Sequence, residues 1–503
     1  MTSHDRERIS NVDTAWLRMD RAENLMQILG VMIFDRQMDY ERLKRTIARR
    51  MLRYRRFRQI AVLETDGAWW VDDPDFDIDT HVRHSILPAP GDTHTLQKFV
   101  AEMASEPLNP AKPRWEFHLV ETGEGHSALV ARIHHAIADG IALIGVMNSL
   151  TDERADAPED GGLAPWSSDS TTTKKEADTH ENDLFWHWVY EPVTDATLAS
   201  IRIGGLLWAQ YLGLRNDPGK TLDYARIAGA IAKEVSKLAL MPNDSKTRFK
   251  GKPGTTKCVA WSDPISLAEV KSVGKVLGCS VNDLLLSSVA GALRGYLQEK
   301  GDPVENAEIR ALVPVNLRAP GDIKNLGNRF GLVALELPVG IENPLARVYE
   351  TRSRMEALKG SYQAMLTFTI LGAVGMAPKF VQEKVLDLLA GKATAVMTNV
   401  PGPQQERYFA GTRLKQQMFW VPQSGDVGMG VSILSYEGKV QFGLITDKNM
   451  VSDPERIIAR FAIEFEKLLW LVLMEPWERL SDPDAVEEAL VEMHGKVIYS
   501  PSR

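Results

Sequence analysis

Apolar residues in the first 150 positions follow two different spacings. Short unbroken apolar runs predict strands, and apolar residues three and four positions apart predict helices. The predicted strands are 26–34, 68–71, 114–120 and 128–133, and the predicted helices are 40–54 and 96–105. Strands that alternate with helices in this way indicate an α/β layered architecture.

The same alternation returns at about residue 257. Ser280 or Asn282 is the expected N-cap of its strongest helix, at 281–298. We interpret the two halves of the chain as candidates for two copies of one fold. The other predicted elements of this half are helices at 267–277 and 454–474, strands at 309–315 and 331–339, and a hairpin of 431–436 with 440–446.

Between the two halves the composition changes. Residues 151–183 are rich in Asp, Glu, Ser, Thr and Gly, which is typical of a partly flexible surface linker. A chain of 503 residues is long enough for two domains. We expect an N-terminal domain at 1–150, a linker with crossover helices at 151–256, a C-terminal domain at 257–480 and a tail at 481–503.

Composition and charge exclude several classes of protein. Apolar residues make up 44% and charged residues 25% of the chain, as in ordinary soluble proteins. The net charge of −8 argues against bulk electrostatic binding to nucleic acid. The two cysteines, Cys258 and Cys279, lack CxxC spacing, which excludes a disulfide framework and a cysteine-based zinc site. Residues 1–11 contain no apolar core, so we expect no secretory signal and a cytoplasmic location.

Three apolar runs are candidates for membrane spans. The run at 360–378 is long enough, but it contains polar residues and glycines and ends in proline, so its hydropathy favours a buried helix. The runs at 203–214 and 468–474 are too short. We therefore expect no span and leave peripheral contact with a membrane or lipid droplets open.

The candidate chemistry lies in the segment His134-His135-Ala136-Ile137-Ala138-Asp139-Gly140, between a predicted strand and an apolar helix. Histidine is the side chain best suited to accept a proton near neutral pH. Neighbours on an extended segment point in opposite directions, so one histidine is expected to be catalytic and the other structural. Metal binding is disfavoured, because adjacent imidazoles rarely converge on one ion.

The aspartate and glycine of this segment have structural interpretations as well. Asp139 is placed to cap the following helix, and Gly140 permits a tight turn with positive φ. A pair of hydrogen-bonded core histidines is the alternative to a catalytic site. The Asp-Gly pair at fixed spacing, between strand and helix, favours catalysis.

This HHxxxDG pattern resembles that of the acyl-CoA-dependent acyltransferase superfamily. Further blocks, in the same order along the chain, resemble the bacterial wax ester synthase/diacylglycerol acyltransferase family. They are residues 106–108 with 113–115, 281–286, 314–318 with 327–331, and the sequence MTNVPGP at 397–403. Together these blocks span roughly residues 10–470.

The resemblance implies two chloramphenicol acetyltransferase-like α/β domains that meet along a substrate tunnel. It implies His135 as general base, His134 as a structural residue and Asp139 in a salt bridge with an arginine. Arg318 is the first candidate for that partner and Arg329 the second. Gly140 and Arg318 are thus expected to support the catalytic histidine.

The resemblance also implies the substrates, which are a long-chain acyl-CoA and either a fatty alcohol or diacylglycerol. No cofactor and no covalent acyl-enzyme are expected, because the thioester is already activated and the chain contains no G-x-S-x-G motif. Positive partial charge is needed where the carbonyl oxygen gains charge. The polar candidates for substrate binding are Asn282, Asp283, Thr398 and Asn399, for which structural roles in turns are the alternative.

Two other functions remain open at this point. One is an acyltransferase of the same fold with another hydroxyl acceptor, such as a polyketide or a peptide-linked hydroxyl. The other is a non-catalytic protein that binds acyl chains at a lipid surface. The basic segment 42–58 favours a solvated helix face over a site for anionic lipid or CoA phosphates.

Overall fold

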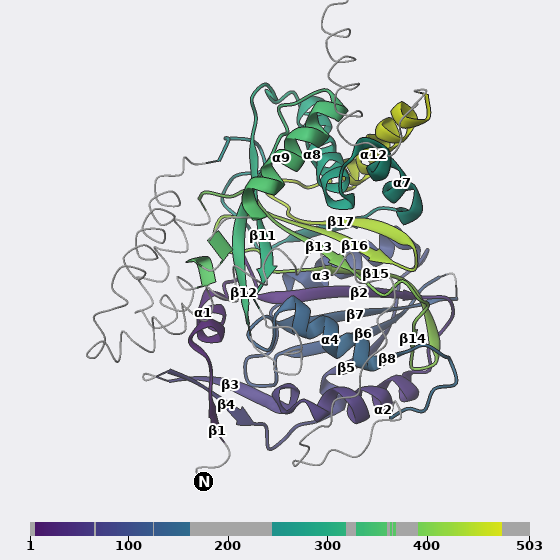
Figure 1. Cartoon of the computed structure of the whole chain (residues 1–503). Helices are drawn as coiled ribbons and strands as arrows, with labels where there is room; N and C mark the ends of the chain where they lie inside the picture. Colours follow the sequence, from purple (N-terminus) through teal and green to yellow (C-terminus); the bar gives the residue numbers. More distant parts are fainter. Residues whose placement is uncertain are drawn as a thin grey trace, which may run out of the picture.

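The computed structural model describes residues 6–64, 67–123, 125–160, 244–317, 328–359, 363–364, 366–368 and 391–474. Two large sheets lie one above the other, and a group of helices covers the upper sheet (Figure 1). Each half has its own hydrophobic core, so the described part of the chain is a layered α/β protein, as its pattern predicts.

The lower sheet belongs mainly to the N-terminal half. Its strand order is β5-β6-β7-β2-β15-β14-β8, and all neighbours are antiparallel except β5 and β6. The strands are β5 (Val82–Ile86), β6 (Trp115–Glu121), β7 (Ser127–His134), β2 (Gln27–Phe34), β15 (Thr412–Trp420), β14 (Tyr408–Phe409) and β8 (Thr151–Asp152).

The upper sheet belongs to the C-terminal half. Its order is β10-β17-β16-β13-β11-β12, with β9 also paired to β17, and β13 is parallel to both of its neighbours. Its strands are β9 (Lys257–Trp261), β10 (Ile265–Ser266), β11 (Ile309–Asn316), β12 (Phe330–Leu337), β13 (Ala395–Pro401), β16 (Met429–Tyr436) and β17 (Lys439–Asp447).

The helices over the upper sheet are α7 (Leu267–Leu277), α8 (Val281–Glu299), α9 (Pro344–Lys359) and α12 (Glu455–Met474). The most buried is α8, which packs against both α9 and α12 (Figure 1). Ser280 caps it and Asp283 completes a capping box, so one of the two expected N-caps is confirmed.

The lower half carries α1 (Asn11–Met19), α2 (Tyr40–Arg50), α3 (Thr93–Ser105) and α4 (Gly140–Leu150). Short 3-10 turns lie at Met51–Arg53, Arg55–Arg58 and Ile78–Thr80. A small antiparallel sheet of β1 (Arg6–Arg8), β4 (Gly67–Asp72) and β3 (Gln59–Glu64) lies at the outer side of this half (Figure 1).

The C-terminal half contributes two strands to the lower sheet. β14 and β15 belong to the C-terminal half in sequence but lie in the lower sheet, where β15 pairs with β2 along Leu414–Trp420. The expected C-terminal domain at 257–480 therefore includes two strands of the other sheet. Most of the expected linker, residues 161–243, and the expected tail at 481–503 lie outside the described residues.

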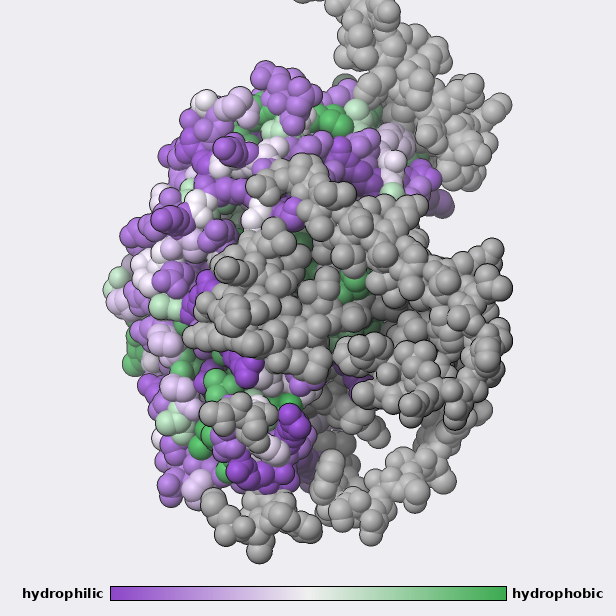
Figure 2. Space-filling model, turned by 90° about the vertical axis from the view of Figure 1, so that its left-hand side faces the viewer, coloured by the Kyte–Doolittle hydropathy of each residue, from purple (hydrophilic) through white to green (hydrophobic). Residues whose placement is uncertain are grey.

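No single described helix is long and apolar enough to cross a membrane, although the bent pair α7 and α8 meets the length and composition criteria together. The described surface in Figure 2 is mainly hydrophilic, with hydrophobic residues in small groups. The apolar run at 203–214 and all but a few residues of the run at 360–378 lie outside the described residues, and 468–474 ends α12.

Candidate active site

The two histidines lie where β7 ends and the chain turns into α4. His135 N donates to Met26 O at 2.7 Å, and Ile137 N donates to His134 O at 3.0 Å, which closes a turn. Both side chains are buried, yet they have different neighbours. The expected division of the pair into two environments is therefore present in the structure.

The His135 ring lies between aromatic side chains. It stacks on Trp16 with ring centroids 4.4 Å apart, and Phe330 lies at 5.5 Å. Burial lowers the pKa of His135 to about 4, although the nearby Asp139 carboxylate opposes this shift. The ring is therefore neutral at pH 7 and able to accept a proton.

His134 has polar neighbours instead. Ala136 N donates to His134 Nδ1 at 3.1 Å, so the proton of the ring is on Nε2, which lies 3.5 Å from Asp20 Oδ2. Asp20 Oδ1 accepts from Met26 N at 2.9 Å, and Arg114 Nη1 lies 3.3 Å from Asp20 Oδ2. Because Met26 O also receives His135 N, His134 supports the backbone that carries its neighbour.

The Asp139 carboxylate accepts hydrogen bonds from both halves of the chain. Its Oδ1 accepts from Ala142 N at 2.9 Å, which confirms that it caps α4. Its Oδ2 accepts from Arg329 N at 2.9 Å, a contact with the backbone of the second candidate arginine. Arg318, the first candidate for a salt bridge with Asp139, lies outside the described residues.

The expectation for Gly140 is wrong. Asp139 takes the extended N-cap conformation, at φ −77° and ψ 170°, and Gly140 is the first residue of α4 rather than a residue with positive φ. A Cβ built on Gly140 would meet no atom within 4 Å, and the residue lines a cavity. The glycine thus leaves room beside the loop that carries His135.

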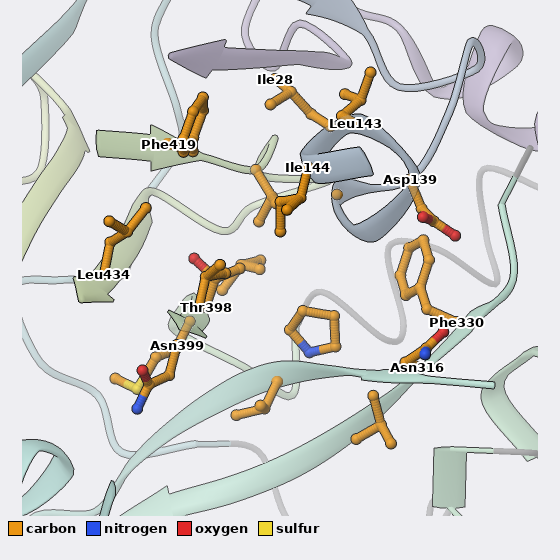
Figure 3. Close-up of a pocket in the computed structure, with 18 of the residues that line it drawn as sticks. Ile28, Asp139, Leu143, Ile144, Asn316, Phe330, Thr398, Asn399, Phe419 and Leu434 are labelled. Carbon is orange, nitrogen blue, oxygen red and sulfur yellow. The ribbon is translucent and has the colours of Figure 1, made fainter. Parts of the chain in front are cut away.

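The cavity has a volume of about 330 Å³ and lies between the two sheets. Apolar side chains of β2, β7 and α4 face it from below, and β11, β12 and β13 line it from above. In Figure 3, Asp139 and Phe330 lie on one side, and Phe419 and Leu434 lie on the other. Phe419 lies over Gly30, where a Cβ would come within 2.7 Å of its ring.

Three of the four residues expected to bind substrate line this cavity with His135, namely Asn282, Thr398 and Asn399 (Figure 3 labels the last two). Asn399 Nδ2 donates to Asn282 Oδ1, and Thr398 Oγ1 donates to Val431 O at 3.3 Å. Asp283 does not line the cavity; its carboxylate accepts from Ser280 in the capping box of α8. Its position gives a structural role and no support for substrate binding.

The basic segment 42–58 is largely paired with carboxylates. Arg50 is buried and lies 3.0 Å from Asp152, while Arg45 and Arg49 both reach Glu159 at 3.0 Å. These pairs hold residues 151–160, the start of the expected linker, against α2. Further pairs are Lys44–Asp79, Arg55–Asp72 and Arg56–Glu7.

Sequence reasoning missed several residues around the two histidines, namely Asp13, Trp16 and Asp20, and left Asn328 and Phe330 without a role. Asp13, Trp16 and Asp20 lie in or next to α1, a helix that was not predicted, more than a hundred positions before the histidines. The apolar residues Val12, Ala15, Trp16 and Met19 have helical spacing and offered a signal for it. No group of three or more described His, Cys, Asp or Glu side chains is placed to hold a metal ion.

Family models match most of the chain. The model described as wax ester synthase/diacylglycerol acyltransferase catalytic domain matches residues 9–285, and the WS/DGAT C-terminal domain matches residues 326–469. The chain is 27% identical over 429 residues to "Probable diacyglycerol O-acyltransferase tgs1" of Mycobacterium tuberculosis, covering 82% of this chain and 85% of that protein. The tgs2 protein of the same organism is 26% identical, covering 79% of this chain and 83% of that protein.

Solved structures agree with this in fold. The wax ester synthase/diacylglycerol acyltransferase from Marinobacter aquaeolei superposes with a TM-score of 0.63 and 19% identity, covering 93% of this chain and all of that one. A starter condensation domain of rhizomide synthetase, in complex with C8-CoA and Leu-SNAC, superposes with a TM-score of 0.55 and 12% identity, covering 95% of this chain and 96% of that one. The predicted fold class of two such α/β domains is confirmed. The chain belongs to the wax ester synthase/diacylglycerol acyltransferase family and, as predicted, is an acyltransferase.

Proposed function

We propose that the protein transfers a long-chain acyl group from acyl-CoA to the hydroxyl of a fatty alcohol, of diacylglycerol, or of both. The observation that carries this proposal is a neutral, buried histidine in the wall of an apolar cavity. An apolar cavity suits acyl chains, and a neutral imidazole suits the deprotonation of an alcohol. The names of the relatives support diacylglycerol as one acceptor.

In the proposed reaction His135 Nε2 accepts the hydroxyl proton while the alcohol oxygen attacks the thioester carbon. His135 Nδ1 is enclosed without a hydrogen-bond partner among the described residues, which favours Nε2 as the nitrogen that meets substrate. The carbon–sulfur bond then breaks, and His135 returns the proton to the CoA thiolate. An ester and free CoA leave, and no acyl group is attached to the protein.

The carbonyl oxygen gains negative charge during this attack and needs hydrogen-bond donors. We assign this task to the amide pair of Asn282 and Asn399, with Thr398 beside it. Their mutual hydrogen bond fixes the orientation of both amides, and all three residues line the cavity with His135. We further propose that the protein works at the cytoplasmic face of a membrane or lipid droplet, because its acceptors are lipids.

The test is release of free CoA from palmitoyl-CoA by the purified chain, with hexadecanol and dioleoylglycerol in separate reactions. General base catalysis contributes about 10²–10⁴-fold, so His135→Ala should lose nearly all turnover. His84→Ala is the matched control, since His84 pairs with Glu121 away from the cavity. More than a tenth of wild-type activity in His135→Ala would exclude His135 as the base.

A second measurement addresses the acyl-enzyme. The protein is incubated with palmitoyl-CoA in the absence of acceptor, and its intact mass is recorded. An unchanged mass is the expected result. A mass increase equal to one palmitoyl group would show that a covalent intermediate forms.

A further inference from the structure

A buried amide connects the His135 backbone to α1. Asn328 Nδ2 donates to His135 O at 2.8 Å and to Asp13 Oδ1 at 2.6 Å. Asn328 N also donates to Asp13 Oδ1, at 3.1 Å. Asp13 is 3% exposed and Asn328 is 5% exposed, so these bonds form away from water. Both N–H bonds of the Asn328 side chain amide are thereby given a direction.

Asp13 and Trp16 are three positions apart on α1 and therefore lie on one face of that helix. Trp16 stacks on the ring of His135, while Asp13 reaches its carbonyl through Asn328. Burial raises the pKa of Asp13, although the hydrogen bonds from Asn328 oppose this shift. A carboxyl group held in this way is costly to bury, and its two hydrogen bonds from one residue, through the backbone N–H and the side-chain amide of Asn328, indicate an orienting task.

Three consecutive residues of the C-terminal half contact the catalytic loop. Asn328 binds the carbonyl of His135, Arg329 N binds Asp139 Oδ2, and the Phe330 ring lies against the His135 ring. The loop therefore receives its carbonyl, carboxylate and ring contacts from a strand end of the other half.

Two atoms in this cluster lack partners among the described residues. They are Asn328 Oδ1, which can only accept a hydrogen bond, and His135 Nδ1, which donates when it carries the ring proton. Asn328 also acts to raise the pKa of His135, against the effect of burial. A small rotation of the amide or the ring would join the two atoms and keep the lone pair on Nε2.

We infer that Asp13 and Asn328 are positioning residues for the acyl transfer: Asp13 orients the amide of Asn328, and this amide fixes the carbonyl and the ring of His135 toward the cavity. The inference rests on the proposed role of His135 as the base. On this inference, the loop that carries His135 reaches its active arrangement only when the two halves of the chain are in contact.

The first test compares Asp13→Asn with Asp13→Leu. Asparagine keeps the Oδ1 that accepts both N–H groups of Asn328, whereas leucine removes it. We expect Asp13→Asn to keep kcat within about threefold and Asp13→Leu to lower kcat about 10²-fold, the size expected from a misplacement near 1 Å. KM for palmitoyl-CoA should change less than twofold in both. Equal losses in the two variants would overturn the orienting role.

The second test is Asn328→Ala, alone and combined with Asp13→Leu. Because the two residues act in series, the double variant should be no slower than Asn328→Ala. Asn343→Ala is the matched control, since Asn343 accepts from Leu345 N and Ala346 N at the start of α9, away from the cavity. A folded Asn328→Ala with kcat within twofold of wild type, or multiplicative losses in the double variant, would contradict the inference.

A third measurement does not depend on activity. Nitrogen NMR of histidine-labelled protein reports which ring nitrogen carries the proton. In the wild type His135 should carry it on Nδ1, and in Asn328→Ala the two tautomers should mix. If wild type shows this tautomer but releases no CoA, the proposed function fails and the network stands; if the tautomer is the same in both proteins, the network fails.

Discussion

Two neighbouring positions of the loop between β7 and α4 hold the same kind of side chain in opposite surroundings. His135 lies among Trp16, Phe330 and the apolar cavity, and one of its ring nitrogens has no partner among the described residues. His134, one position earlier, meets Ala136 N and the carboxylate of Asp20. The surroundings, and not the residue type, therefore separate a group suited to proton transfer from a group that holds the backbone.

Exchange of each histidine for alanine should give the largest effects, a loss of rate at His135 and a loss of stability at His134. His135→Ala should lower kcat by about 10²–10⁴-fold with a small change in melting temperature. His134→Ala should instead lower the free energy of unfolding by about 2–3 kcal/mol, because Asp20 and Ala136 N lose a buried partner. Steady-state rates and thermal melting of both proteins measure the split. If both variants lose activity equally and melt equally, the two positions have no separate roles.

Asp139→Asn should lower both the stability of the protein and its rate. Asparagine still caps α4 through Oδ1, but its NH2 group would face Arg329 N, so one partly buried hydrogen bond is lost. We expect a loss of about 1–3 kcal/mol in stability and a decrease of up to about 10²-fold in kcat. Asp92→Asn, at the exposed N-cap of α3, is the control. A variant with full melting temperature and full rate would show that Asp139 does not brace the loop.

Gly140→Ala should change the cavity beside His135 and leave the surroundings of His134 as they are. The added Cβ meets no protein atom within 4 Å, and alanine is a better helix former than glycine, so stability should be kept or raised. The same methyl group occupies substrate space, and kcat/KM should fall about tenfold. The control is Gly251→Ala, whose Cβ would lie 3.6 Å from Met450 outside the cavity. A destabilised Gly140→Ala with normal kcat/KM would contradict this assignment.

The pH dependence should give the smallest change. A pKa of about 4 keeps His135 neutral, so kcat/KM should stay within twofold from pH 8 to pH 5 and reach half its value near pH 4. An ordinary histidine would give half the rate near pH 6.5. Half-maximal kcat/KM near pH 6.5 would show that the ring is not desolvated during catalysis.

The same pKa has a consequence for stability. Since the pKa of His135 is lower in the folded state than in the unfolded state, its contribution is present above pH 6.5 and is lost as pH falls toward about 4. The full difference is roughly 3 kcal/mol. Wild type should therefore lose more stability between pH 7 and pH 5 than His135→Ala does.

Local patterns predicted the elements well. The strands at β2, β7 and β11 and the helices α3, α7 and α8 follow their apolar spacing, because each buries one face or a continuous apolar run. The cap of α4 by Asp139 was equally accessible, since capping depends on residues within one turn. Gly140 was misjudged because Asp139 already supplies the non-helical conformation that the turn needs.

The surroundings of His135 could not be predicted in the same way. Asn328 reaches His135 across 193 positions and Asp13 across 315, and no periodicity links residues at such separations. The basic segment at 42–58 gave a similar difficulty, because its partners Asp152 and Glu159 belong to residues that look like a linker by composition. Which residues form hydrogen bonds and ion pairs depends on the assembled fold, and local patterns in a single sequence do not predict it.

The pairing of β15 with a strand of the other half has a consequence for the synthesis of this protein. β2 is an almost entirely buried strand that pairs with β7 on one edge and with β15 on the other. While the ribosome has not yet released residues 412–420, one edge of β2 has no strand to pair with. Such an apolar edge invites pairing with other chains. Every nascent copy therefore has an unpaired edge of β2 until residues 412–420 have been synthesised, and this edge forms part of one wall of the cavity in the finished fold.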